Sequence, residues 1–465
     1  MKILNDILND IVILETHGNI DAGVSSVSLN SKMIEPHSLF VALSGNVVDG
    51  HIFIDEVIEK GATTIVYEHE PKEFKHGINY IKVADSHSAI GIIASNFYDN
   101  PSHKMKLVGV TGTSGKTTTA TLLHQLFRDL GHKVGMIGTV VNKVNDKSYE
   151  AHRTTPDAVT LNELLAEMVD DGCEYCFMEV SSHSVSEKRI AGLHFVGGIF
   201  TNLTLDHLDY HKTMDDYCDA KKGFFDIIPA AGFAISNIDD ERGQYMLSTT
   251  KAHTYTFSLK KDADFNERFE SKLIGEFNAY NLLGIYAAAV LLGEDKGKIK
   301  EAFKNLEAVP GRFQYYKSEN GVTGIVDYAH KPDALLNVLK TANEMKGSGR
   351  VIAVVGCGGD RDRSKRPIMA KIGYDMSDIL ILTSDNPRTE KPEDIIEEMM
   401  KGIEGLPNEK VYILLDRREA ISQACLEALP GDIILIAGKG HETYQEVNGV
   451  QTHFDDLEEL QKYLK

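Results

Sequence analysis

The sequence has few cysteines, no long apolar run and no excess of positive charge. Its five cysteines, among 465 residues, form an odd and scattered set, which is typical of free thiols in a reducing compartment. No apolar run approaches the length of a membrane span, and the first residues, Met1-Lys-Ile-Leu-Asn-Asp6, are too polar for a signal peptide. A formal net charge of −20 argues against a nucleic-acid or anionic-membrane partner. We therefore expect a cytoplasmic protein with no nucleic-acid partner and no membrane insertion.

Two of the cysteines, Cys173 and Cys176, have the C-x-x-C spacing of some metal and redox sites. No second pair and no histidine cluster follows at zinc-ligand distance. The pair leads into an apolar run, so we interpret both as buried, inert thiols at the entrance to a strand.

The length of the chain exceeds what one hydrophobic core usually supports, and short apolar runs alternate with helical stretches throughout. Polar, proline-marked connections at residues 100–104 and 309–313 divide the chain into three predicted α/β domains, 1–97, 98–309 and 310–465. The central domain should hold a mostly parallel sheet with helices on both faces. The last domain should be Rossmann-like, with strands at Gly324–Tyr328, Val351–Gly356, Ile379–Ser384, Lys410–Leu415 and Asp432–Ala437.

A glycine-rich stretch after the apolar run Met105–Val110 predicts a phosphate-binding loop. A helical pattern follows it and ends near Gly131. In such a loop the backbone N–H groups face phosphates, the lysine reaches the outer phosphates and the threonine hydroxyl binds Mg²⁺. The match to G-x-x-x-x-G-K-[ST] is incomplete because Val110 stands at the first glycine. The predicted ATP-contacting residues are Gly112, Thr113, Ser114, Gly115, Lys116, Thr117 and Thr118.

Four further stretches are too polar for ordinary strand ends, and each follows a predicted strand. In open α/β sheets, ligands bind beyond the carboxyl ends of the strands, so together these stretches indicate an active site. Each of them alone could be a loop cap. They are residues 179–184, 201–211, 327–333 and 437–442.

With these motifs the chain resembles the Mur ligase family, the ATP-dependent amide-forming enzymes of peptidoglycan precursor synthesis, over nearly its whole length. The family's phosphate loop accounts for Val110. The matching motifs are Thr111-Gly-Thr-Ser-Gly-Lys-Thr-Thr118, Thr154-Thr-Pro-Asp157, Glu179-Val-Ser-Ser-His183, Asp206-His-Leu-Asp-Tyr-His211, Gly358-Gly-Asp-Arg-Asp362, Asp385-Asn-Pro-Arg388 and Gly438-Lys-Gly-His-Glu442.

The resemblance implies a mechanism in which a substrate carboxylate attacks the γ-phosphate of ATP and an amine then displaces phosphate from the acyl phosphate. The catalytic residues would be Lys116, Glu179, His207 and Lys221. Two Mg²⁺ ions are expected, with Thr117, Glu179, His207 and a CO₂-derived carbamate on Lys221 as ligands. A helix-surface lysine, the alternative for Lys221, describes Lys222 better.

The resemblance also assigns the remaining ATP contacts. Asn278 and Asn281 would contact adenine, Arg312 phosphate, and Asp327 the ribose or a hinge. Helix capping is the plainer interpretation of the two asparagines, and it is compatible with a nucleotide role.

For the nucleotide-sugar substrate, the family pattern Asp-Ser-Arg is replaced by Asn30-Ser31-Lys32, which leaves Ser31 as the uridine-pocket residue. The muramoyl-dipeptide would be bound by Thr154, Thr155, Ser181 and Arg189. A surface salt bridge is the alternative for Arg189.

The Asn-Pro-Arg sequence resembles that of the diaminopimelate-adding type. A guanidinium grips the far carboxylate of meso-diaminopimelate bidentately but repels the ε-ammonium of lysine. Arg361 and Arg388 would hold carboxylate, and Asp385, Gly438 and Glu442 the far ammonium end. The whole predicted diaminopimelate set is Arg361, Asp385, Asn386, Pro387, Arg388, Gly438 and Glu442. The alternative for Arg388 is that it only caps a loop after Pro387.

The expected reaction is therefore addition of meso-diaminopimelate to UDP-N-acetylmuramoyl-L-Ala-D-Glu by a monomer. Three alternatives stay open: lysine or another amino acid as substrate, a folylpolyglutamate-type relative, and a P-loop nucleotide switch or kinase. The segment between Phe257 and Phe277 is shorter than in the family, which leaves two interpretations: the central domain lacks an accessory sheet there, or the sequence omits a disordered piece.

Overall fold

The structure is a computed structural model that describes residues 1–45 and 48–464. Contacts among residues divide the chain into two compact units. The first comprises Met1–Leu203, His211–Glu267 and Leu283–Ile299, and the second Thr204–Tyr210, Arg268–Leu282 and the chain from Lys300 onward. Both are α/β, and each mixed sheet is mostly parallel, which confirms the predicted fold class. The three domain boundaries remain a prediction.

The first unit begins with a five-stranded sheet. Its order is β2 (Ile13–His17), β7 (Asn79–Val83), β6 (Ala62–Tyr67), β5 (Ser38–Val41) and β4 (Val27–Ser28), and only β2 is antiparallel to its neighbour. Side chains alternate along β5, so that Leu39 and Val41 face one core and Phe40 the other. Helices α1 (Leu4–Ile7) and α3 (Ser86–Phe97) cover the first face, and α2 (Ile54–Glu59) covers the second. The smaller elements here are β1 (Lys2–Ile3), β3 (Gly23–Val24) and η1 (Gly50–Phe53).

An eight-stranded sheet follows in the same unit. Its order is β11 (Lys147–Glu150), β10 (Val141–Val144), β9 (Val134–Ile137), β12 (Tyr175–Glu179), β8 (Lys106–Thr111), β13 (Gly197–Phe200), β14 (Phe233–Asn237) and β15 (His253–Phe257). The six strands β9, β12, β8, β13, β14 and β15 are parallel, whereas β10 and β11 form an antiparallel hairpin at the edge beside β9.

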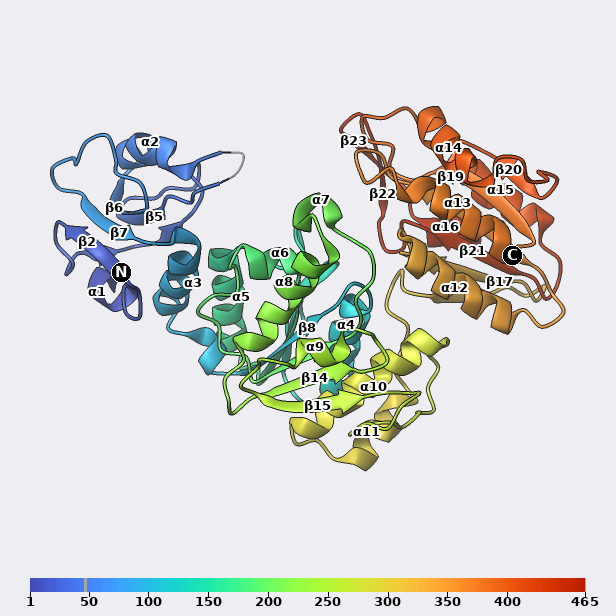
Figure 1. The fold of residues 1–465 in the computed structure, drawn as a ribbon, viewed down its shortest axis with the longest axis horizontal. Coiled ribbons are helices and arrows are strands. Elements are labelled where there is room, and N and C mark those ends of the chain that lie inside the picture. Colours follow the sequence, from blue (N-terminus) through green and yellow to red (C-terminus); the bar gives the residue numbers. More distant parts are fainter. Residues whose placement is uncertain (46–47, 465) are drawn as a thin grey trace. The chain divides into compact units, whose positions relative to one another are not determined.

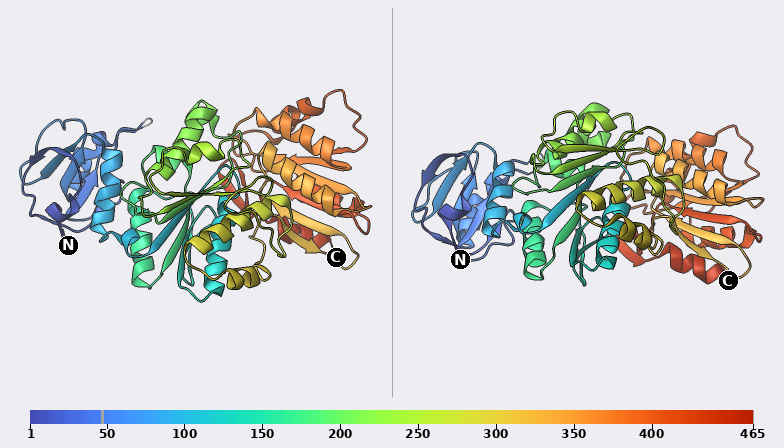
Figure 2. Two further views of the ribbon diagram at one scale, coloured as in Figure 1. Left: turned by 60° about the horizontal axis from the view of Figure 1, so that its bottom comes forward. Right: turned by 90° about the horizontal axis from the view of Figure 1, so that it is seen from below.

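Helices cover both faces of this sheet, as Figures 1 and 2 show. On β12, the Phe177 ring contacts Phe127 of α4 (Lys116–Asp129), while Cys176 and Met178 join the core with α5 (Ala158–Asp170) and α8 (Met214–Asp226). A parallel strand buried on both faces explains the continuous apolar run. Cys173 and Cys176 are buried free thiols, as predicted. The remaining elements are η2 (Pro101–His103), α6 (Ser182–Ser186), α7 (Leu208–His211), α9 (Gly243–Met246), α10 (Glu276–Leu291) and α11 (Lys296–Phe303).

One of the two interpretations of the shortened segment after β15 is that it lacks an accessory sheet. All of residues 258–275 are described; Phe265 forms an isolated bridge with Phe257 of β15, and no strand lies within this range.

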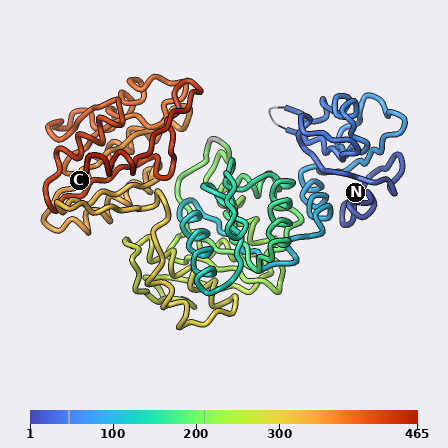
Figure 3. Tube along the Cα trace, turned by 180° about the vertical axis from the view of Figure 1, so that it is seen from behind, coloured from blue at the N-terminus to red at the C-terminus, as the bar shows by residue number. Residues whose placement is uncertain are grey.

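The second unit is built on a six-stranded sheet from the last third of the chain; Figure 3 traces this part in orange to red. Its order is β16 (Gln314–Lys317), β17 (Thr323–Asp327), β21 (Ile433–Ala437), β18 (Val351–Cys357), β19 (Ile379–Ser384) and β20 (Val411–Ile413), and only β16 is antiparallel. The five predicted strands are confirmed. The edge strand β16 and the hairpin of β22 (Tyr444–Val447) and β23 (Val450–His453) lie outside the predicted set.

Helices cover both faces of the six-stranded sheet. One core contains side chains of α12 (Pro332–Met345), α13 (Lys365–Met376) and α14 (Pro392–Met400), and the other contains those of α15 (Arg417–Glu427) and α16 (Asp456–Tyr463). A short turn, η3 (Lys401–Ile403), follows α14.

The strand order decides which polar residues lie together. In the eight-stranded sheet, β12 and β13 flank β8, so Glu179 and Thr201 lie on either side of the phosphate loop. In the six-stranded sheet, the adjacent parallel strands β17, β21, β18 and β19 end near Asp327, Gly438, Gly358 and Asp385. All four polar stretches therefore lie at carboxyl strand ends, as predicted.

Candidate active site

The predicted phosphate loop connects β8 to the N-terminus of α4. Gly112 and Gly115 have φ values of +151° and +85°, which favour glycine. The Lys116 ammonium donates hydrogen bonds to the carbonyl oxygens of Gly112 at 2.9 Å and Thr113 at 3.1 Å. The lysine thus folds back over the loop, whose backbone N–H groups and helix terminus form an anion cradle.

Residues after β13 hold this loop in shape. The Asn202 side-chain oxygen accepts the N–H of Ser114 at 3.0 Å, and its backbone oxygen accepts that of Thr113 at 2.8 Å. The Thr201 hydroxyl donates to the Ser114 carbonyl oxygen at 2.6 Å. A methyl group on Gly112 would overlap the Thr201 hydroxyl, so the residue must be glycine for this clamp to close.

Glu179, at the end of β12, is the carboxylate of this site and is 1% exposed. One of its oxygens, Oε2, accepts the Thr117 hydroxyl at 3.0 Å, and the other accepts the Thr139 N–H at 2.8 Å. The Thr139 hydroxyl lies 3.1 Å from both Glu179 Oε2 and Thr154 Oγ1. Thr139 was missed by sequence reasoning, although a polar residue two positions after the end of β9 was an available signal.

Lys221 lies on α8 and is 1% exposed, as its assignment requires. Its Nζ donates to the Gly112 carbonyl oxygen at 2.8 Å and lies 4.6 Å from the centre of the Tyr217 ring. The Tyr217 hydroxyl is 3.1 Å from Thr113 Oγ1. The interpretation of Lys222 as a helix-surface lysine was wrong: it is 8% exposed, because its ammonium packs against Asp226 at 2.9 Å and against Thr249.

The residues predicted for the muramoyl-dipeptide gather beside Glu179. The Thr155 hydroxyl donates to the Glu179 carbonyl oxygen at 2.7 Å and lies 3.4 Å from Ser181 Oγ. Arg189 donates to the Thr155 carbonyl oxygen at 2.9 Å, and it also pairs with Glu187, so the salt bridge considered as an alternative is present. Thr154 joins the group through Thr139.

Ser31 lies in a turn of the first sheet's region, apart from this group along the chain. Its carbonyl oxygen accepts the Lys60 ammonium at 2.9 Å. The non-family residue Asn30 accepts the Lys32 N–H at 3.0 Å, so it shapes the turn.

The second unit contains His207. Its ring lies 3.0 Å from the Asp206 carboxylate, which also pairs with Lys331. Burial alone would raise the pKa of Asp206, but the charges of Lys331 and His207 lower it to about 2. His207 has a φ of +53°, an uncommon conformation for a residue with a side chain.

Arg312 and Asp327 meet at the end of β17. The Arg312 guanidinium lies 4.5 Å from the centre of the Tyr328 ring, and Asp327 accepts the Phe313 N–H at 2.6 Å. Burial raises the pKa of Asp327 to about 6, although Arg312 opposes the shift.

Asn278 and Asn281 are both buried at the start of α10. Asn278 donates to the Ile274 carbonyl oxygen at 2.8 Å, and Asn281 donates to Asn278 at 3.4 Å. The Asn278 side chain therefore serves the local backbone, whereas the Asn281 amide contacts the Asn278 side chain.

The loop after β19 carries the predicted amino-acid-binding residues. Asn386 is 1% exposed and fully engaged: its Oδ1 accepts the Lys439 ammonium and the Glu446 N–H, both at 3.0 Å, and its Nδ2 donates to Glu442 at 2.8 Å. The Asn386 side chain therefore holds the loop after β19 against Lys439, Glu442 and Glu446. Lys439, which is fully buried and 3.2 Å from Glu442, was missed by sequence reasoning.

Charges of both signs lie together here. Burial, and then the charge of Asp385, raise the pKa of Glu442, while Lys439 opposes the shift. Gly438 has a φ of +123°, and a side chain there would run into the Asp385 carboxylate. Glycine thus leaves space beside these two acids.

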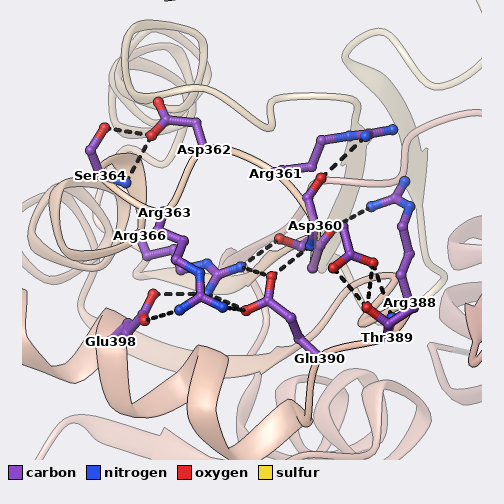
Figure 4. Close-up of polar contacts among 12 residues, drawn as sticks. Asp360, Arg361, Asp362, Arg363, Ser364, Arg366, Arg388, Thr389, Glu390 and Glu398 are labelled. Carbon is purple, nitrogen blue, oxygen red and sulfur yellow. Dashed lines mark hydrogen bonds and ion pairs between the residues drawn. The ribbon is translucent and has the colours of Figure 1, made fainter. Parts of the chain in front are cut away.

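The Arg388 and Arg361 loops are joined to each other, as Figure 4 shows. Arg388 Nη1 donates to the Gly359 carbonyl oxygen at 2.8 Å, and the Gly359 N–H donates to the Asn386 carbonyl oxygen at 2.9 Å. Part of the Arg388 side chain does cap a loop. Arg361 is exposed, with one contact to the Asp360 carbonyl oxygen at 3.3 Å. Pro387 contributes its carbonyl oxygen to the Glu390 N–H at 3.0 Å.

Among residues 1–45 and 48–464, no group of three or more His, Cys, Asp or Glu side chains is arranged to hold a metal ion. Within the same residues, no helix combines the length and apolar character that crossing a membrane requires.

Family models of known proteins match three successive segments of the chain. Three family models match in order: Mur ligase family, catalytic domain (residues 23–98), Mur ligase middle domain (110–290), and Mur ligase, glutamate ligase domain (311–440).

The similar curated proteins include two named UDP-N-acetylmuramoyl-L-alanyl-D-glutamate--2,6-diaminopimelate ligase. The one from Cytophaga hutchinsonii is 52% identical over 97% of each chain, and the one from Bacteroides fragilis is 50% identical over 99% of this chain and 98% of its own. A solved structure of a protein with that name is 30% identical, with a TM-score of 0.71 over 100% of this chain and 99% of the other. From this agreement over its full length, the chain belongs to the Mur ligase family.

Proposed function

We propose that the protein uses ATP to join meso-diaminopimelate to UDP-N-acetylmuramoyl-L-alanyl-D-glutamate through an amide bond. The observation that carries this proposal is the loop Asp385–Arg388, which combines a carboxylate and a guanidinium in a chain half identical to relatives named for that ligation. A ligand with an ammonium and a carboxylate on its far carbon complements both charges.

In the proposed reaction, the glutamyl carboxylate attacks the γ-phosphate of ATP to give an acyl phosphate and ADP. The amine of the second substrate then attacks the acyl carbon, phosphate leaves, and the amine loses its proton. Transfers of this kind depend on placement and charge neutralisation. Lys116 would neutralise the outer phosphates, and the N–H groups from Gly112 to Thr118 would hold the phosphate chain.

The donor set beside the phosphate loop fits Mg²⁺. Thr117 and Glu179 supply oxygen ligands 3.0 Å apart, and Mg²⁺ typically takes one or two carboxylates together with substrate phosphates. His207 and a carbamate on Lys221 would serve a second ion. When bound, the two ions supply charge neutralisation at the transferring phosphoryl group.

Lys221 fits carbamylation because its Nζ is shielded and directed at the phosphate loop. The ammonium first loses a proton; the resulting amine then forms an N–C bond with CO₂ and releases a second proton, which leaves an anionic carbamate. That change replaces a cation by oxygen ligands beside Gly112.

For the nucleotide sugar, Thr154, Thr155, Ser181 and Arg189 would contact the muramoyl-dipeptide, and Ser31 the uridine. The closeness of Thr155, Ser181 and Arg189 to Glu179 supports the placement of the dipeptide, because the glutamyl carboxylate must reach the γ-phosphate. Asn278, Asn281, Arg312 and Asp327 would complete the binding of ATP.

Selection of diaminopimelate would come from Arg361 and Arg388 on the far carboxylate and from Asp385 and Glu442 on the far ammonium. Lysine has no far carboxylate and would leave both guanidinium groups without a partner. We further propose that the protein acts as a cytoplasmic monomer, without nucleic-acid or membrane partners.

The test is phosphate release with ATP, Mg²⁺ and UDP-N-acetylmuramoyl-L-Ala-D-Glu, with meso-diaminopimelate or L-lysine as the amine. Release that depends on diaminopimelate supports the proposal. Preference for lysine retains the ligase but contradicts the role of Arg388. Release independent of either amino acid favours a nucleotide switch or kinase.

A further inference from the structure

Arg366, the second residue of α13, is a fully buried arginine that no step of the proposed reaction uses. Its guanidinium forms a two-pronged pair with Glu390, Nη1 to Oε2 at 3.0 Å and Nη2 to Oε1 at 2.8 Å. Nη1 also donates to Glu398 at 2.8 Å, and Nη2 to the Gly358 carbonyl oxygen at 3.2 Å. One buried cation therefore contacts two separate loops and a helix (Figure 4).

The two loops are those that carry Arg361 and Arg388. Gly358 begins the first loop, after β18, and Glu390 ends the second, after β19. Glu390 also accepts the Asp360 N–H at 2.6 Å, so the partner of Arg366 is itself tied to the first loop.

Further bonds join the loops along their length. The Asp360 carboxylate accepts the Thr389 N–H at 3.1 Å and the Thr389 hydroxyl at 2.8 Å. Asp360 and Arg388 both have a φ of +53°, so each loop holds a residue in the left-handed region next to these bonds. Such conformations persist where surrounding contacts hold them.

We propose that Arg366 and Glu390 are positioning residues that set the distance between the Arg361 and Arg388 loops and thereby the selectivity for the far carboxylate of the amino-acid substrate. This inference rests on the proposed function, because it assigns that carboxylate to Arg361 and Arg388. Neither positioning residue touches the substrate; both act through the loops.

The geometry distinguishes this role from general support of the fold. Glu398 lies on α14, and its bond to Arg366 has the same 2.8 Å length as the bond from Arg366 Nη2 to Glu390. It also pairs with Arg363 of the first loop at 3.2 Å, but unlike Glu390 it does not belong to the second loop and so does not join the two. Removing the Glu398 charge should weaken the buried cluster without separating the loops. Removing the Glu390 charge should weaken the connection between the loops.

The experiment compares Glu390→Gln and Arg366→Lys with the matched control Glu398→Gln, each as the full chain. Lysine keeps the charge of Arg366 but cannot form the two-pronged pair. The measurements are KM for meso-diaminopimelate, KM for ATP, and the ratio of kcat/KM for meso-diaminopimelate to that for L-lysine, with thermal unfolding to verify folding.

We expect Glu390→Gln and Arg366→Lys to raise KM for meso-diaminopimelate about tenfold or more and to lower the ratio similarly, because a displaced guanidinium no longer meets the carboxylate. KM for ATP should change less than about twofold, and Glu398→Gln should stay within about threefold of the wild type throughout.

Unchanged KM and ratio in both loop variants would overturn the inference. So would an equal loss in Glu398→Gln, or a loss of kcat with every KM unchanged, because either result indicates general support of the fold. If the wild type releases no phosphate in response to meso-diaminopimelate, the proposed function itself fails, and that control is read first.

Discussion

Replacing Gly359 by alanine tests how closely the Arg361 and Arg388 loops must approach. A methyl group there would lie 2.7 Å from the Pro387 carbonyl carbon and would overlap its oxygen. Carbon atoms pack at about 3.5 Å or more, so the loops must separate by roughly 1 Å. No side-chain rotation relieves this clash, because the opposing atoms belong to the backbone.

Separation of the loops would break two hydrogen bonds. The Gly359 N–H loses the Asn386 carbonyl oxygen, and Arg388 Nη1 loses the Gly359 carbonyl oxygen. At about 1 kcal/mol for the neutral bond and about 2 kcal/mol for the charged one, the loss is about 3 kcal/mol. If it falls wholly on the bound state, kcat/KM for meso-diaminopimelate should fall about a hundredfold.

The assay is amino-acid-dependent phosphate release, with Gly297→Ala as the matched control. A methyl group on Gly297, an exposed position of α11, would lie 3.1 Å from Asp295 Oδ1, the end of an exposed side chain outside both loops, so this variant should lose less than about threefold. KM for ATP should stay near the wild-type value in both variants. The reasoning is refuted if Gly359→Ala retains kcat/KM within threefold, or if the two variants lose it equally.

Three other substitutions test separate parts of the structure. Lys221→Ala should lower turnover at least about a hundredfold, with partial recovery when short-chain carboxylates are added; near-normal turnover, or no recovery, would contradict the carbamate. Lys439→Met removes the cation that opposes the raised pKa of Glu442, so that pKa should rise further. The acid limb of the kcat/KM profile for diaminopimelate should then move to higher pH. An acid limb that does not move counts against the role of Lys439. Asp456→Ala leaves the fully buried Arg417 without its partner and should destabilise the second unit by about 3–5 kcal/mol, measured by hydrogen exchange, whereas removing the exposed acid of the Lys371 pair, Asp375→Ala, should cost little.

Much of the fold could be predicted because parallel strands buried on both faces leave a plain mark in the sequence. The runs that became β12, β18 and β21 are apolar and lead into polar loops, so the positions of these strands could be predicted from the sequence. The ligand site expected at their carboxyl ends stays a prediction. The phosphate loop could also be predicted from the sequence, because its glycines, lysine and threonine are contiguous.

The strands that were missed lack this signal. β16 is an edge strand with alternating half-buried and exposed residues, and the β22–β23 hairpin is largely exposed. Pairing with a neighbour rather than burial defines them, and pairing partners are distant in the sequence.

The missed charged residues share one physical property: they are buried among partners that the fold brings together. Arg366 looks like a surface charge in the sequence, yet it is fully buried because Glu390 and Glu398 from later segments neutralise it. Lys439 pairs with the nearby Glu442 but also donates to Asn386, 53 residues earlier, and Lys222 packs against Thr249 as well as the nearby Asp226. Single-sequence patterns describe neighbours along the chain and contain no direct record of such pairs.

In the second unit, the arginine proposed to bind the substrate and the arginine that pairs with protein carboxylates are different residues. An arginine proposed to grip a substrate carboxylate should not be fully satisfied by protein carboxylates, so backbone contacts have to orient it. Arg388 Nη1 donates to the Gly359 carbonyl oxygen, and its Nε forms one long ion pair with Glu446 at 3.7 Å, while the shorter carboxylate pairs are made by Arg366. The hydrogen bonds from Arg366 lower the pKa of Glu390 to about 2, so this support stays ionised across the whole range in which the enzyme would work. Selectivity for a charged substrate then depends on a buried ion pair that never meets the substrate, and it should respond to changes in that pair without a change in the binding of ATP.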